Sequence, residues 1–64
     1  MGWVVVEKYK EKGDLLEKEH KRWLNVAEDV GLFADERNVR VVEANGEYRV
    51  EISEEMNDFF HVGQ

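Results

Sequence analysis

The sequence contains no cysteine, no proline and no threonine, and it has only two histidines and one serine. The lack of cysteine excludes disulfides, thiol chemistry and thiolate zinc sites, and it favours a reducing, cytoplasmic setting. His20 and His61 are too few for an imidazole-rich metal cage, and we expect neither a metal nor another cofactor. The longest purely apolar run is Trp3 to Val6, so we expect no membrane-spanning segment and no signal-peptide core.

Charged residues are abundant instead. Of the 64 residues 38% are charged, with nine bases and fifteen acids and a formal net charge of -6. Leu, Ile, Val and Phe nevertheless supply 18 residues, which is about 28% and above the roughly 20% below which disorder is expected. We therefore predict one small folded domain over residues 1–64.

The small size restricts the function. A chain of about 60 residues buries only some 60% of the surface that its unfolded form exposes, so self-association, most simply as a homodimer, is expected. An enzymatic pocket would consume much of so small a core, and we expect a protein that is not an enzyme.

The first predicted element is a strand over residues 3–10, which is rich in Val and aromatic residues and is followed by Gly13. Strict alternation divides the strand into two faces. One face holds Trp3, Val5, Glu7 and Tyr9, and the other holds Val4, Val6, Lys8 and Lys10.

A helix is predicted next, over residues 15–30. Asp14 followed by Glu17 resembles a capping box at its start, and Gly31 can adopt the left-handed conformation that ends a helix, with Leu32 folding back on the last turns. Its apolar side chains fall on an arc of about 180°. They are Leu15, Val26, Val30, Trp23, Leu16, Ala27 and Leu24.

The dipeptide Asn45-Gly46 gives the strongest local signal, because it lies between two β-rich runs and favours a two-residue type I′ hairpin. The predicted strands are residues 39–44 and 47–53. Counting outward from the turn pairs Ala44 with Glu47 and Arg40 with Glu51. In this register Val39, Val41, Val50 and Ile52 share one face.

The C-terminal segment, residues 54–64, is predicted to form a short helical turn after a Ser53 cap, because Met56, Phe59 and Phe60 have helical spacing. The alternatives are an extended strand at residues 60–62 or a tail whose two Phe side chains fill a groove on a partner.

The fold class that follows is α+β, a β-α-β-β minidomain. We expect a three-stranded, mainly antiparallel sheet ordered 2-3-1, with one helix packed on it and the short C-terminal helical turn or tail. The alternative places strand one parallel beside strand two. If the helix covers one face only, the C-terminal segment or a second copy of the chain has to cover the other.

Few residues offer chemistry. Glu17 and His20, three residues apart on the helix, would make half of a carboxylate-histidine metal site, but no second such pair completes it, so His20 is interpreted as a half-buried helix residue. Ser53 is the sole hydroxyl nucleophile apart from tyrosine, and it is interpreted as a cap or strand-end residue. We predict no catalytic and no metal-binding residues.

The distribution of charge is more informative. Residues 1–24 carry a net charge of +1 and residues 25–64 a net charge of -7. The acids predicted to form a rim that binds a partner are Glu28, Asp29, Asp35, Glu36, Glu54, Glu55 and Asp58. The apolar residues predicted to form a self-association surface or partner groove are Trp23, Leu24, Met56, Phe59 and Phe60.

These features favour a non-catalytic, acidic protein-interaction module, a small regulator or inhibitor that binds a basic surface of a macromolecular partner. Its size and charge are typical of accessory regulators such as virus-encoded inhibitors. The alternative is a structural protein that only assembles with itself. Nucleic-acid binding is less favoured, because acids are interleaved with the basic residues that would carry it. Those residues are Lys8, Lys10, Lys12, Lys18, Lys21 and Arg22.

Overall fold

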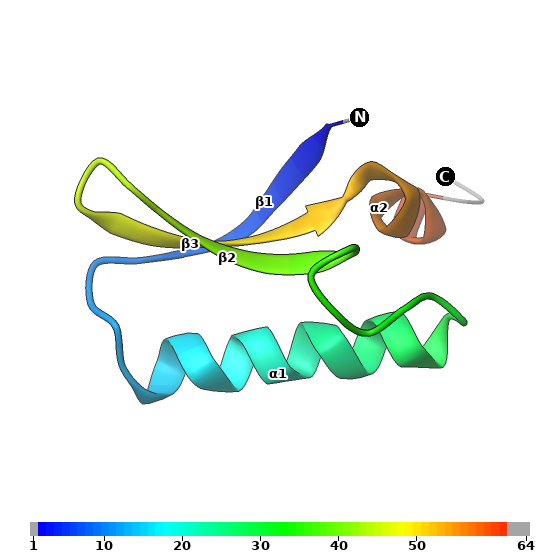
Figure 1. Ribbon diagram of the computed structural model, residues 1–64, viewed down its shortest axis with the longest axis horizontal. Helices are drawn as coiled ribbons and strands as arrows, with labels where there is room; N and C mark the ends of the chain where they lie inside the picture. Colours follow the sequence, from blue (N-terminus) through cyan, green and yellow to red (C-terminus); the bar gives the residue numbers. More distant parts are fainter. Residues whose placement is uncertain (1, 62–64) are drawn as a thin grey trace.

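The structure, a computed structural model, describes residues 2–61 (Figure 1). Its elements are β1 (Trp3–Tyr9), α1 (Asp14–Asp29), β2 (Val39–Ala44), β3 (Glu47–Ser53) and α2 (Glu54–His61). The sheet is antiparallel, with the order β1-β3-β2. The predicted α+β class and the predicted strand order are thus confirmed, and strand one does not pair with strand two. The last residues of the predicted C-terminal segment, 62–64, lie outside the described residues.

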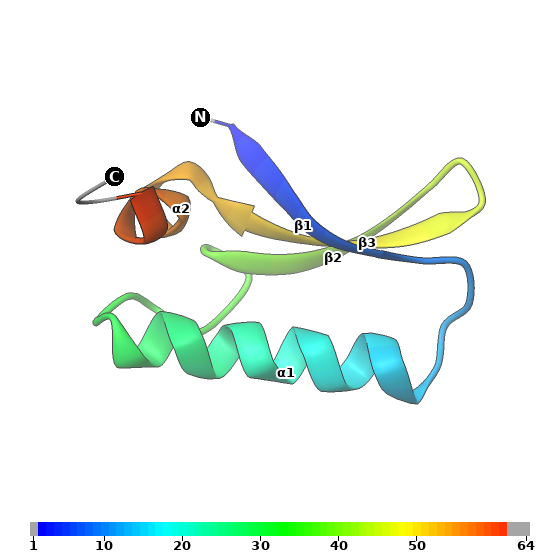
Figure 2. The same ribbon diagram turned by 180° about the vertical axis from the view of Figure 1, so that it is seen from behind.

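α1 lies along one face of the sheet, whereas α2 lies at one end of the sheet and contributes Met56 to the core. Figures 1 and 2 show α1 running along the sheet and α2 beyond the end of β3. Six side chains that are at most 4% exposed form the core, and they come from α1, from the two hairpin strands and from α2. They are Leu16, Ala27, Val39, Val50, Ile52 and Met56. Because Met56 joins the core under α1, the C-terminal segment does not cover the opposite face of the sheet, which was one of its two expected covers.

The hairpin has the register that the sequence predicts. Val39 lies opposite Ile52, Arg40 opposite Glu51, and Ala44 opposite Glu47. Asn45 and Gly46 have φ angles of 53° and 76°, which are the positive values that a type I′ turn requires of both central residues.

The alternation predicted for the first strand is wrong beyond Val5. Val5 lies opposite Glu51 and Glu7 opposite Val50, so β1 carries one extra residue between these pairs. Such a bulge exchanges the faces of all the residues that follow it. Tyr9 therefore lies on the helix side and packs against the core.

For α1, the structure confirms the predicted C-terminal cap but not the predicted N-terminal cap. The residue before the helix is Gly13, which has no side chain to accept a hydrogen bond, so the proposed Asp14 cap is wrong. Asp14 is the first helical residue, where its charge still suits the helix dipole. At the other end Gly31 has a φ of 83°. The N–H of Leu32 donates to the Ala27 carbonyl at 2.9 Å, which confirms the predicted glycine-ended cap.

The face of the sheet opposite α1 is partly covered by its own side chains. The Arg40 guanidinium lies 3.9 Å from the centroid of the Trp3 ring, and its Nε donates to Glu51 Oε1 at 2.8 Å. Glu51 is only 8% exposed although it lies on the sheet face away from α1. The predicted Arg40–Glu51 pair is therefore present, and it closes this face at the N-terminal end of β1.

Candidate interaction surface

The acids of the predicted rim come from three segments that lie in one half of the molecule. These segments are the end of α1, the loop that follows it, and α2, all in the right-hand half of Figure 1. We refer to residues 28–38 and 54–61 together as the acidic end. It contains all seven predicted acids, and Arg37 is its one lysine or arginine.

The acidic end accounts for the whole formal net charge of the chain. Its seven acids and one base give a net charge of -6, and the remaining residues contain eight acids and eight bases. Folding thus converts a gradient along the sequence into a molecule with one strongly negative end and a neutral remainder. The local potential at that end favours positively charged ligands and surfaces.

One of the seven acids is already neutralised within the chain. The Arg37 side chain donates to Asp35 at 2.6 Å from Nη2 and at 3.0 Å from Nε, and the backbone N–H of Arg37 adds a bond of 2.9 Å. These hydrogen bonds lower the pKa of Asp35 to about 2. The Arg37 guanidinium also lies 3.6 Å from the centroid of the Phe33 ring. Arg37 and Asp35 thus join two positions of the loop, and Arg37 neutralises one of the seven acids of the acidic end.

A partly buried hydrogen-bond network joins the loop, β3 and α2 at this end. Ser53 Oγ accepts from the N–H of Met56 at 3.1 Å, which confirms the predicted cap of α2, and it donates to Asn38 Oδ1 at 2.8 Å. Asn38 is 5% exposed, and its Nδ2 donates to the carbonyl of Phe33 at 2.9 Å. The network attaches α2 and the loop to the end of β3 and so positions the acids that these segments carry.

A hollow of about 650 Å³ opens in the acidic end, between the start of β1, the loop and α2. Its lining includes the aromatic residues Trp3 and Phe33 and three acids, Glu54, Glu55 and Asp58. Arg37, which lies over the Phe33 ring, is the one base in the lining. Aromatic faces and carboxylates are the groups that attract a guanidinium or ammonium ion. The sequence gives no sign of this hollow, because its two rings lie thirty positions apart.

The predicted apolar surface is not one exposed patch. Met56 is fully buried in the core, and Trp23 and Leu24 pack against the core from α1. Phe59 and Phe60 are 46% and 41% exposed, and the Phe60 ring meets Trp23 edge-on with 5.6 Å between centroids. Any self-association through this region would therefore use the two Phe side chains and not Met56.

The basic residues that the sequence offered for nucleic-acid binding are divided between two layers. Lys8 lies opposite Arg49 on the sheet face away from α1, whereas Lys18, Lys21 and Arg22 belong to α1. Arg22 is also paired with Glu19 at 2.8 Å. Lys8 is thus separated from the basic residues of α1 by the sheet.

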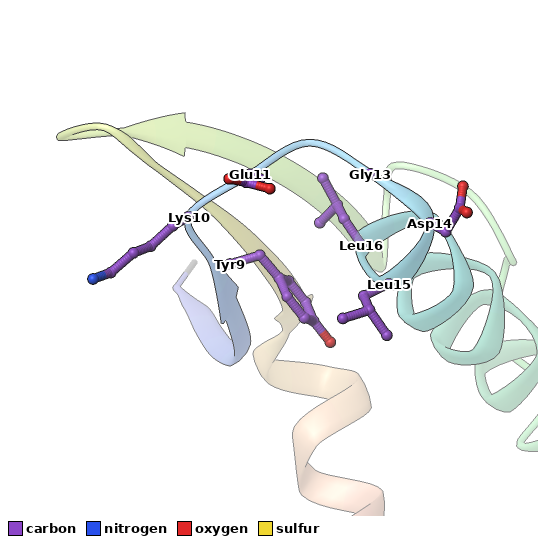
Figure 3. A pocket seen from close by; sticks show the side chains of 7 residues that line it. All are labelled: Tyr9, Lys10, Glu11, Gly13, Asp14, Leu15 and Leu16. Carbon is purple, nitrogen blue, oxygen red and sulfur yellow. The ribbon is translucent and has the colours of Figure 1, made fainter.

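A second hollow, of about 400 Å³, lies at the opposite end of the molecule, where β1 connects to α1 (Figure 3). The Tyr9 ring and the side chains of Leu15 and Leu16 border it, while the charged ends of Lys10 and Asp14 point away from it. The Tyr9 hydroxyl and the Glu11 carboxylate are the remaining polar groups of its lining, so it offers few groups that would orient a ligand.

Residues 2–61 contain no cluster of three or more potential metal ligands. His20 is half-buried between α1 and β2. No helix in this part of the chain is long and apolar enough to cross a membrane.

The fold thus defines a small α+β domain with one strongly acidic end. Comparisons with models of protein families, with curated proteins and with solved structures found no match to the chain.

Proposed function

We propose that this protein is a non-catalytic interaction module that regulates or inhibits a macromolecular partner by binding the partner's basic surface with its acidic end. The observation that carries the proposal is the confinement of the whole net charge of -6 to residues 28–38 and 54–61. A reducing, intracellular setting is part of the proposal, because the chain has no cysteine.

Glu28 and Asp29 support a role in binding, because their positions are unfavourable for the stability of α1. Glu28 and Asp29 are exposed at the carboxyl end of α1, and this helix has no basic residue in its last turn. Each charge there faces the negative end of the helix dipole and costs about 0.3–1 kcal/mol. In a complex, the positive charges of a partner would attract the Glu28 and Asp29 carboxylates and offset their unfavourable interaction with the helix dipole.

The hollow beside α2 supports the same chemistry. It combines the Trp3 and Phe33 rings with three carboxylates, and each ring already has an arginine of its own chain over one face. An arginine or lysine side chain of the partner, inserted between these rings and carboxylates, would anchor the complex.

The proposal is tested by titrating the protein with a fluorescently labelled oligo-arginine peptide at several salt concentrations. The acidic-end variant is the triple substitution Glu36→Gln, Glu55→Gln, Asp58→Asn. The matched control, Glu11→Gln, Asp14→Asn, Glu17→Gln, removes the same charge from exposed positions outside the acidic end and outside β2.

We expect affinity to fall steeply with salt, and the acidic-end variant to bind at least tenfold more weakly than the control. Equal weakening by both triple variants would mean that net charge alone attracts the peptide. An affinity that does not change with ionic strength would remove the electrostatic mechanism altogether.

A further inference from the structure

The outer side of β2 is an unpaired sheet edge. It is the edge nearest the reader in Figure 1, and no other described strand pairs with it. The N–H of Ser53 in β3 donates to the Asn38 carbonyl at 2.9 Å, so the backbone of Asn38 faces β3. The N–H of the next residue, Val39, faces the other way and donates to the Asp35 carbonyl at 3.0 Å. Successive residues of an antiparallel strand direct their backbone groups to opposite sides. Val41 and Glu43 therefore point their N–H and C=O groups away from β3, along the free edge.

The other edge of the sheet is protected against pairing. β1, nearest the reader in Figure 2, carries the bulge between Val5 and Glu7, and Lys8 is exposed on it. Bulges and edge lysines are devices that natural sheets use to prevent association between edges. β2 has no bulge and no lysine, and Glu43 is its exposed charged residue. It pairs with β3 without irregularity, and its middle residues are Val41, which is 37% exposed, and Val42.

We propose that β2 of a second copy of this chain occupies this edge, in an antiparallel pairing centred on Val42 that joins two sheets into one of six strands. In this register Val41 of each copy lies opposite Glu43 of the other, and the outward backbone groups of both residues are satisfied. The two Val42 side chains meet across the two-fold axis on the face away from α1. The contact is isologous and closes at the dimer.

The charge distribution favours a second copy in this orientation. The acidic loop enters β2 at Val39, so antiparallel pairing places the two acidic ends at opposite ends of the dimer. One copy is 34 Å long, which is several times the Debye length of about 8 Å at physiological salt. The backbone contact is made by β2, in which Arg40 and Glu43 balance to no net charge. The dimer would therefore leave both acidic ends exposed.

The helix layer is compatible with this arrangement. Two hollows, of about 410 and 400 Å³, adjoin Val41 on the helix side, and Leu16, His20 and Leu24 of α1 contribute to their lining. α1 contacts both β2 and β3. Its axis therefore lies over the middle of this strand pair, about half a strand spacing from β2 in the direction of β3. With strands about 4.8 Å apart, the two α1 helices would lie about 10 Å apart, close to the usual 8–10 Å packing distance. Packing of one helix against the other would fill the hollows.

Cysteine cross-linking tests the register, because the chain has no cysteine of its own. We expect Val42→Cys to form a disulfide-linked dimer within minutes to hours in a glutathione buffer, since directly opposed β-carbons lie about 4.5–5.5 Å apart. The control is Ala44→Cys, on the same strand and the same face, whose counterpart in the second copy would lie four positions away. Cross-linking of Val42→Cys that is no faster than that of Ala44→Cys would overturn the proposal.

Sedimentation equilibrium tests the association itself. We expect the wild-type chain to be a dimer, and Val41→Pro to be a folded monomer, because this substitution removes an N–H that the single chain does not use. Val41→Lys, which keeps the backbone N–H and adds an edge charge, should also be monomeric, and it decides the question if the proline variant does not fold. A monomeric wild-type chain at about 0.5 mM would contradict the proposal. The proposal would also be contradicted if both Val41 variants remained dimeric while the double variant Phe59→Ala, Phe60→Ala was monomeric.

Discussion

Ser53 is the residue whose loss should most directly weaken the acidic end. Replacing it by alanine removes the cap of α2, which is worth about 1 kcal/mol. It also removes the donor to Oδ1 of Asn38, a residue that is 5% exposed, and an unsatisfied buried acceptor costs about 1–3 kcal/mol. We therefore expect Ser53→Ala to lower the free energy of unfolding by about 2–4 kcal/mol. A domain of this size has roughly 3–10 kcal/mol in total.

The assay is guanidinium unfolding followed by far-UV circular dichroism. With a slope of about 2 kcal/mol per molar, the midpoint should fall by about 1–2 M. Ser53→Thr keeps the hydroxyl and should lose less than about 1 kcal/mol. The double variant with Asn38→Ala should cost less than the sum of the two single variants, because both break the same bond. A loss below about 0.5 kcal/mol for Ser53→Ala, or strict additivity with Asn38→Ala, would refute the reasoning.

Three further outcomes follow from burial and charge. Met56→Ala should cost about 2–4 kcal/mol in denaturant unfolding because Met56 is fully buried, while Phe59→Ala, at a 46% exposed position, should cost less than about 1 kcal/mol. Asp29→Asn should raise stability and Asp14→Asn should lower it, each by about 0.3–1 kcal/mol, since the two acids lie at opposite ends of the same helix dipole; thermal unfolding with the same sign for both would contradict this. The pKa of Asp35, lowered to about 2 by its arginine partner, should be visible in a carboxyl NMR titration. The stability that this carboxylate adds is present above about pH 4 and is lost as the pH falls towards 2.

Local patterns in the sequence were sufficient for the elements and for most of the pairing. Asn45-Gly46 fixes the turn, and the period-two alternation on either side of it fixes the register, because a slip by one residue would turn Val39 and Ile52 away from the core. Gly31 and Ser53 mark helix ends through interactions that span only a few residues. Such short-range signals can be read from a single sequence.

Other features depend on residues that meet only after folding. The bulge in β1 has no local signature, since the residues around it are ordinary β-formers, and it is the pairing with β3 that exchanges the faces. The burial of Met56 and the exposure of Phe59 depend on how α2 turns against the core, which helical spacing alone does not reveal.

For the candidate surface, the sequence by itself determined the amounts of charge, the acids involved and the lack of alternatives such as thiol chemistry. Only the tertiary structure decided that seven of these acids share one end and that the rest of the chain is neutral, because residues 28–38 and 54–61 are brought together by the Ser53–Asn38 network. It also decided which sheet edge is left open. β2 is an edge strand because β3 lies in the middle of the sheet. This order in turn depends on which apolar strand faces pack against α1.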